Sequence, residues 1–329
     1  THGAMTTLDD HVGGPYPDTA VVNHEWWDPS TFADLGVIPS SRIEELSEGR
    51  MHGDVRVRLN RAVVDHDIAL VVGPVLPHEV VGMSGGNKYF FPGVAGQEII
   101  DVSHWLGALI TSAEIIGTTD LTPVRALIND GAALIPADTY AFSVVTAEDG
   151  AGLHSVSFGD PQTSWSEAAR ISAATHVTYL DAPVRRVLSL VPAMYDEIWT
   201  GAKGFYKVEP VVADGGEVIL YAPHIREIAT SHPQIHEIGY HCRDYFVKQW
   251  DRFSQFHWGV LAHSTHLRGA GTFEDGVERL RVDVTLATGI PEEVCRSVNL
   301  GYRDPATIDV AGFDGLVVPR AGEVLYRLR

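Results

Sequence analysis

The sequence predicts an α/β protein of two α/β domains, with mainly parallel sheets and a cleft between them. Short apolar runs suited to buried strands alternate along the chain with segments of helical periodicity. The 329 residues, 45% of them hydrophobic, exceed what one core usually holds. We expect a first domain over residues 1–180, a second over 181–304, and a C-terminal hairpin over 305–329 that returns to the first domain.

The elements of the first half follow from local patterns. Residues 68–72 (IALVV) form a continuous apolar run, typical of a parallel strand covered on both faces. Residues 96–117 carry apolar side chains at helical spacing. Residues 139–160 predict a hairpin with Asp149 and Gly150 in its turn, and Ser164 with Glu167 forms a capping box that opens a helix over 164–177.

The second half repeats the alternation. Residues 202–225 predict a helix, a glycine turn and a buried strand, and residues 236–253 predict a further helix. Residues 278–290 predict a strand, and residues 291–302 a helix with Pro291 near its first turn. The tail, residues 315–329, predicts a final hairpin.

Composition limits the classes of partner. The net charge of −19 repels nucleic acid and anionic membranes, so neither is expected as a partner, whereas a small anionic substrate needs a locally basic pocket. Cys242 and Cys295 form no CxxC pair, which favours a reduced, cytoplasmic setting. No run approaches the roughly 18 apolar residues of a membrane span.

A glycine-rich loop carries the first candidate site. Ser84, Gly85, Gly86, Asn87 and Lys88 lie between the strand at 68–72 and the helix at 96–117, where open α/β sheets bind ligands. Paired glycines let the backbone approach a ligand closely, and successive N–H groups can cradle an anion. Lys88 can bind a phosphate or act as a covalent amine; the structural alternative is a tight turn with a solvated lysine.

Two histidines bracket this loop. His78 follows a proline at the end of a strand, a position suited to a general base, although a loop histidine bonded to the backbone is the alternative. His104 lies in a mostly apolar helix, where it is either a satisfied core residue or a metal ligand whose imidazole is held neutral by a second partner.

Residues 75–104, VLPHEVVGMSGGNKYFFPGVAGQEIIDVSH, resemble the signature of the nickel-dependent lactate racemase family, including the steps from His78 to Lys88 and on to His104. The resemblance implies a nickel-pincer nucleotide (pyridinium-3-thioamide-5-thiocarboxylic acid mononucleotide) with Ni(II). It implies that Lys88 is joined to this cofactor beside Ser84, Gly85 and Gly86. His104 is then the protein ligand to nickel, and His78 one of two catalytic histidines.

The resemblance extends to both sides of this motif. Thr1–Thr6 (THGAMT) is similar to the stretch that holds the second catalytic histidine, which makes His2 the candidate; a tag remnant is the alternative. Because no initiator Met is present, we expect either a fragment that lacks the family's first segment or a cloning remnant. Lys203 matches a substrate-binding lysine, with a solvated lysine as the alternative, and Thr200 stands where the family has glutamine.

The resemblance therefore implies a racemase or epimerase that inverts C2 of a small 2-hydroxy acid by hydride transfer, and that depends on cofactor biosynthesis proteins as partners. Two alternatives remain open. One is a zinc metallohydrolase that uses the many histidines, although no HExxH motif is present. The other is a protein that binds the nucleotide cofactor without turnover.

Overall fold

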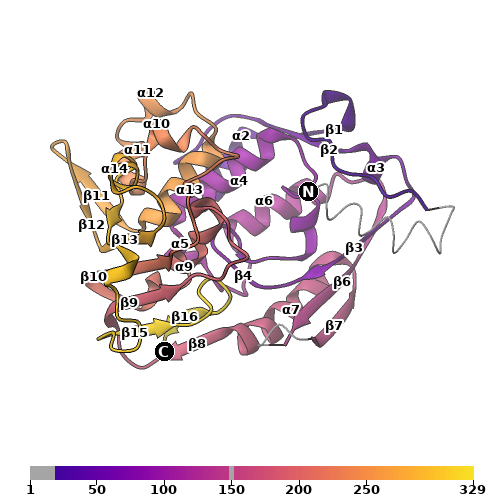
Figure 1. Ribbon diagram of the computed structural model, residues 1–329. Helices are drawn as coiled ribbons and strands as arrows, with labels where there is room; N and C mark the ends of the chain where they lie inside the picture. The colour runs from indigo at the N-terminus through magenta and orange to yellow at the C-terminus, as the bar shows by residue number, and fades with distance from the viewer. Residues whose placement is uncertain (1–18, 148–151) are drawn as a thin grey trace.

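The computed structural model describes residues 19–147 and 152–329, which form a mixed α/β fold with mainly parallel sheets (Figure 1). The predicted fold class is confirmed. His2 and the predicted Asp149–Gly150 turn lie outside the described residues. No helix in the described part of the chain is long and apolar enough to cross a membrane.

The first sheet has the order β3-β6-β7. Its strands are β3 (Ile68–Pro74), β6 (Asp138–Thr146) and β7 (Leu153–Gly159). β3 and β6 are parallel, whereas β6 and β7 form the predicted antiparallel pair. Helix α7 (Pro161–His176) covers one face of this sheet. Trp165 on α7 and Val145 on β6 belong to one buried cluster between them.

The prediction that β3 is covered on both faces is wrong among the described residues. Ile68 and Val72 are 62% and 66% exposed, and Phe158 on β7 is 60% exposed. Side chains alternate along a strand, so one set faces α7 while the other set faces outward. The apolar run thus shows that this strand is rich in β-branched residues, but it does not show which faces are covered.

The other elements of the first half surround helix α4 (Gln97–Ile110). The strands are β1 (Phe32–Ile38) and β2 (Val55–Asn60), which are antiparallel, and the short pair β4 (Pro77–His78) and β5 (Gly82–Met83). The helices are α2 (Ser40–Leu46), α3 (Arg61–Val64), α5 (Ser112–Ile115) and α6 (Pro123–Ala132). The helix predicted over residues 96–117 is interrupted at Thr111, whose φ of 92° is not helical.

The second sheet is parallel throughout, with the order β14-β13-β10-β9-β15. Its strands are β9 (Val184–Leu190), β10 (Val212–Ala222), β13 (Val282–Thr288), β14 (Gly301–Tyr302) and β15 (Leu316–Val318). Helices α8 (Ile198–Gly201), α9 (Lys203–Tyr206) and α14 (Glu292–Ser297) lie in its connections. Helix α13 (Trp258–Arg268) packs on α4, so that one hydrophobic core continues through both halves.

Several predicted elements need correction. The helix predicted over 236–253 is divided into α10 (Ile235–Ile238), α11 (Arg243–Val247) and α12 (Trp250–Phe253). Helix α13 and the antiparallel pair β11 (Gly271–Glu274) and β12 (Val277–Leu280) were not predicted. The side chain of Asp160, not of Ser164, caps α7; Ser164 Oγ instead donates to the Ser157 carbonyl oxygen.

The predicted C-terminal hairpin is wrong. β15 pairs in parallel with β9, and β16 (Leu325–Leu328) pairs in parallel with β8 (Val177–Leu180). The two strands therefore extend the edges of separate sheets. Each strand pairs with an earlier strand whose backbone N–H and C=O groups would otherwise lack partners. Local sequence patterns do not reveal such distant pairing.

Candidate functional site

A cavity of about 480 Å³ opens where parallel strands of the two sheets end. The first sheet contributes the segments that follow β3 and β6, and the second contributes those that follow β9 and β15. β9 lies between β10 and β15, so the chain leaves it toward one side and later returns on the other. Ligands of open α/β sheets bind at such a switch point, outside the carboxyl ends of the strands. We call this space the switch-point cavity. It is lined by Leu76, Pro77, His78, Glu79, Ser84, Thr146, Ala147, His176, Met194, Tyr195, Lys203, Lys207, Arg320, Gly322 and Glu323.

His78 reaches this cavity from β4. Its Nδ1 accepts a hydrogen bond from the Val80 amide at 3.1 Å and lies 3.4 Å from Glu79 Oε2. Its Nε2 has no hydrogen-bond partner in residues 19–147 and 152–329. Burial lowers the pKa of His78 well below its usual value; Glu79 opposes this, while Lys88 and Lys203 add to it. The ring is therefore neutral at pH 7.

Glu79 is the anion at the centre of this group. Burial alone would raise the pKa of its carboxyl, but His78, Lys203 and His266 overcome that effect and hold the pKa far below its usual range. The Tyr206 hydroxyl also hydrogen-bonds to Glu79. The carboxylate is therefore ionised at neutral pH.

Lys88 lies on the short 3-10 helix η2 (Gly86–Tyr89). Burial lowers the pKa of its amine to about 8, opposed by Glu79 and assisted by Arg125 and Lys203. Among the described residues, nothing forms a hydrogen bond or ion pair with Lys88 Nζ. A buried amine that is partly neutral near pH 8 is a competent nucleophile.

The loop that holds Lys88 is fixed by buried polar contacts. The fully buried Arg125 donates from Nη1 to the Gly85 carbonyl at 2.9 Å and from Nη2 to the Met83 carbonyl. Its guanidinium lies 4.0 Å from the centre of the Trp165 ring, whose Nε1 donates to the Ser84 carbonyl at 2.9 Å. These contacts tie the loop before Lys88 to α6 and α7.

Ser84, Gly85 and Gly86, which were predicted to bind the cofactor, are also required by the packing and conformation of the loop. A Cβ on Gly85 would lie 2.5 Å from Val75, and one on Gly86 would lie 2.8 Å from Trp165. Both glycines have positive φ, so close packing and backbone conformation alone require them. Ser84 Oγ accepts from the Leu76 amide at 2.9 Å and donates to the Pro74 carbonyl at 3.3 Å, which ties the loop to the end of β3.

His104 projects from α4 near Lys88 and Glu79, both of which act on its charge. Its Nδ1 lies 2.7 Å from the Ile100 carbonyl oxygen. Because a carbonyl only accepts, this contact assigns the proton of the neutral ring to Nδ1. Nε2 then carries a free lone pair, and no described residue bonds to it. A neutral imidazole oriented by its other nitrogen is the usual form of a histidine metal ligand.

The second half supplies cations to the same cavity. Lys203, at the start of α9, lines it, with Nζ 5.9 Å from the centre of the Tyr195 ring. No ion pair or hydrogen bond to Lys203 Nζ is formed within the described residues. Lys207 Nζ donates to the Glu323 carbonyl at 3.3 Å, and burial lowers the pKa of this lysine to about 8. Thr200 does not line the cavity; its hydroxyl donates to the Glu197 carbonyl at 3.2 Å.

Sequence reasoning missed several members of this group. Glu79 directly follows His78 in the sequence. A carboxylate next to a candidate base could have indicated that Glu79 belongs to the site. Tyr206 and Arg125 gave no local signal, because only the tertiary fold brings α9 and α6 to the loop. His266 is buried, its Nδ1 bonds to the Ser112 hydroxyl, and burial lowers its pKa to about 4.

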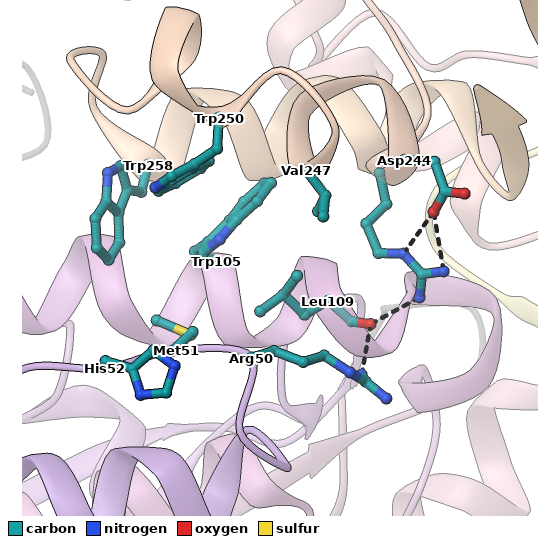
Figure 2. Close-up of a pocket in the computed structure, with 10 residues that line it drawn as sticks. Arg50, Met51, His52, Trp105, Leu109, Asp244, Val247, Trp250 and Trp258 are labelled. Atoms are coloured by element: carbon teal, nitrogen blue, oxygen red, sulfur yellow. Dashed lines mark hydrogen bonds and ion pairs between the residues drawn. The ribbon is translucent and has the colours of Figure 1, made fainter. Parts of the chain in front are cut away.

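A larger cavity of about 640 Å³ lies elsewhere (Figure 2). Trp105, Trp250 and Trp258 form one wall. Arg50 and Arg243 both donate to the Leu109 carbonyl, at 3.2 and 2.9 Å, and so satisfy the C-terminal end of α4. None of His78, Lys88, His104, Lys203 and Thr200 lines this cavity.

The zinc alternative finds no support in the arrangement of side chains. Within residues 19–147 and 152–329, no three His, Cys, Asp or Glu side chains converge into a group that could hold a metal ion. His224 contacts the Tyr195 carbonyl through Nε2 at 3.0 Å.

Comparison with known proteins gives one matching family model and similar solved structures. The family model described as the lactate racemase N-terminal domain matches residues 16–117. The crystal structure of a Thermotoga maritima protein is 35% identical, with a TM-score of 0.85, over 94% of this chain and 78% of that chain. The lactate racemase apoprotein of Thermoanaerobacterium thermosaccharolyticum shares the fold at 16% identity, with a TM-score of 0.73, over 98% of this chain and 75% of that one. No curated protein matches the chain. The matched N-terminal domain, together with a 35% identical relative along nearly the whole chain, shows that the protein belongs to the lactate racemase family.

Proposed function

We propose that this protein is a racemase or epimerase that inverts C2 of a small 2-hydroxy acid with the help of a nickel-pincer nucleotide. The observation that supports this most directly is the convergence of three groups from one sequence motif. Lys88 offers a buried amine without a partner among the described residues, His104 offers a free Nε2, and His78 offers a neutral ring beside the cavity.

The residues present fit this cofactor. The lowered pKa of Lys88, about 8, favours the neutral amine that an amide-type bond requires. The Ile100 carbonyl fixes His104 in the tautomer that can bind a divalent metal through Nε2. In the proposed complex, Lys88 holds the nucleotide and His104 binds its Ni(II). When bound, this group supplies reversible acceptance of a hydride.

The chain's own residues would bind and orient the substrate. Lys203 presents an ammonium group to the switch-point cavity, so it can hold the carboxylate of a 2-hydroxy acid. His78 would then be the group placed to take the hydroxyl proton of the substrate. Inversion requires a second acid–base group on the opposite face of the planar 2-keto acid. His2 is the proposed candidate for that role.

A labelling experiment tests the reaction. The protein is matured together with the cofactor biosynthesis proteins, and modification of Lys88 is mapped by peptide mass. Single enantiomers of 2-hydroxy acids carrying deuterium at C2 are then supplied. We expect inversion with a primary isotope effect and with much of the label kept in the product. Complete loss of the label to water would replace hydride transfer by simple deprotonation, and a loaded protein without turnover would support the cofactor-binding alternative.

A further inference from the structure

We propose that the outward side of the sheet β3-β6-β7 is a self-association surface, on which a second copy of this chain packs to form a reversible, two-fold symmetric dimer. The sheet lies at the margin of the molecule (Figure 1). Its inner side packs against α7, whereas no layer covers its outward side among residues 19–147 and 152–329. The association concerns the protein alone, so it can be measured without cofactor or substrate.

The strand register places apolar side chains in rows across the outward side of this sheet. Residues that pair on neighbouring strands point to the same side, as do residues two apart on one strand. Leu70 pairs with Tyr140. Val72 pairs with Phe142, and Phe142 pairs with Phe158. The exposed apolar members of these rows, which we call the outer face, are Ile68, Leu70, Val72, Tyr140, Val156 and Phe158.

Aromatic rings on the outer face contact one another. The ring centre of Phe158 lies 4.6 Å from that of Phe142 and 6.0 Å from that of Tyr140. Phe158 is nevertheless 60% exposed, and Val72 in the same row is 66% exposed. Single exposed apolar side chains are normal on a protein surface, whereas a continuous patch of them marks a site of interaction. The outer face is such a continuous patch.

The size of the outer face matches one half of a small protein–protein interface. Its members are 38–66% exposed. A large side chain carries about 150–250 Å² of surface, so together they present on the order of 500–800 Å². The largest apolar patch of a typical monomer is about 300–600 Å². Two such faces packed together bury on the order of 1,000–1,600 Å², which reaches the roughly 1,000 Å² that a specific interface needs.

A second copy of the chain is the occupant that fits this surface. Two sheets that pack face to face lie about 10 Å apart, and each contributes alternate side chains to the space between them. A two-fold axis brings the same patch from the partner, so an apolar area of equal size meets the outer face. The partner's sheet thereby supplies the layer that a sheet with two apolar sides needs.

Charge favours one orientation of the two copies. Asp138 pairs with Ile68, so its carboxylate lies at one end of the outer face. A two-fold axis that runs across the strands places the two Asp138 side chains at opposite ends of the interface, where their repulsion is weak. The chain's own first residues fit this surface less well. Residues 1–18 are mostly Gly, Pro, Asp, Thr and His, so they hold too few large apolar side chains to form such a layer.

The experiment is sedimentation equilibrium of the full chain from about 1 to 100 µM, a range suited to an interface at the small end of specific sizes. We expect a reversible equilibrium between monomer and dimer. Phe158→Glu places two charges inside the symmetric interface and should raise the dimer Kd at least about tenfold, as expected for a central aromatic side chain. Val72→Glu, on another strand of the same face, should do the same.

A matched control is Val277→Glu, which adds the same charge at a 48% exposed strand residue outside the outer face, on β12. This variant should leave the dimer Kd unchanged. Phe158 and Val72 are more than half exposed, so neither substitution should unfold the protein. The urea midpoint of each variant checks that folding is retained.

Three results would overturn the proposal. A wild-type protein that stays monomeric at 100 µM would exclude a second copy as the occupant, even if another protein binds this face. A dimer that persists unchanged in both folded variants would place the interface elsewhere. Species that grow beyond the dimer with concentration would indicate open pairing at the free edge of β3 in place of a closed two-fold contact.

Discussion

Replacing Arg125 by Met should destabilise the protein and raise the pKa of Lys88 at the same time. Arg125 is fully buried, bonds to two carbonyls of the loop and lies 4.0 Å from the Trp165 ring. Without it, each carbonyl loses its charged donor, at about 1–3 kcal/mol apiece, and a desolvated cation–π contact of about 2 kcal/mol is lost.

Part of this loss is offset, because a buried cation costs free energy. Burial lowers the pKa of Arg125 from 12.5 to about 9, and its Nε lacks a partner in the described structure. At 1.36 kcal/mol per pKa unit, the relief is on the order of 3–5 kcal/mol. Methionine fills much of the volume, so we expect a net destabilisation of about 2–4 kcal/mol, measured from urea denaturation at constant m-value.

The second readout is the amine of Lys88. Arg125 helps to lower the pKa of Lys88, so its loss should move that pKa above 8. Amine acylation followed by peptide mass against pH reports this shift. The control is Arg296→Met, which removes an exposed pair with Glu292 and should cost below about 0.5 kcal/mol. A stability change in Arg125→Met no larger than this control, or a Lys88 profile that stays in place, would refute the reasoning.

Three further predictions concern single side chains. In the apoprotein, acylation of Lys88 should be half-maximal near pH 8, because burial favours the neutral amine. An ordinary lysine would give a midpoint near pH 10.4, about its usual pKa. A midpoint near pH 10 for Lys88 would contradict the buried site. His104→Ala should lower the nickel content of the matured protein while the urea midpoint changes little, and unchanged nickel would assign the metal to another residue. Lys203→Met should raise KM for a 2-hydroxy acid at least about tenfold, the loss of a charge-assisted hydrogen bond, with the urea midpoint as the control for folding; an unchanged KM would remove Lys203 from the substrate site.

Three of the predicted site residues lie in one continuous segment, and their roles are predictions that follow from the family resemblance. His78, Lys88 and His104 follow one another along β4, η2 and α4, and the chain brings them close enough for Lys88 and His104 to act on the charge of His78. Here local patterns suffice, since a strand's carboxyl end followed by a glycine-rich loop determines where the side chains emerge. The break at Thr111 lies beyond the last of these residues and so does not disturb them.

The covering of β3 could not be predicted in the same way. A run of Val, Ile and Leu indicates a strand, but whether a second layer covers it depends on elements far away in the sequence. The same limit applies to the tail, where β15 and β16 take partners about 130 and 150 residues earlier in the chain. Turn signals between neighbours predict hairpins and carry no information about such distant pairing.

In the second half of the site, Lys203 was predicted from the family resemblance alone, and Tyr206 was not predicted. Lys203 and Tyr206 lie on α9, a helix of 4 residues that is too short to show any apolar period. Their positions follow from the strand before them, because β9 ends at the switch point and its connection must begin there. Glu79 is different, since it was visible in the motif yet gained its meaning only when Lys203 and Tyr206 were placed around it. The surroundings of a charged residue in a motif thus depend on side chains from distant parts of the chain. In this protein, Lys203 and Tyr206 surround Glu79, whose carboxylate lies 3.4 Å from the proposed base His78.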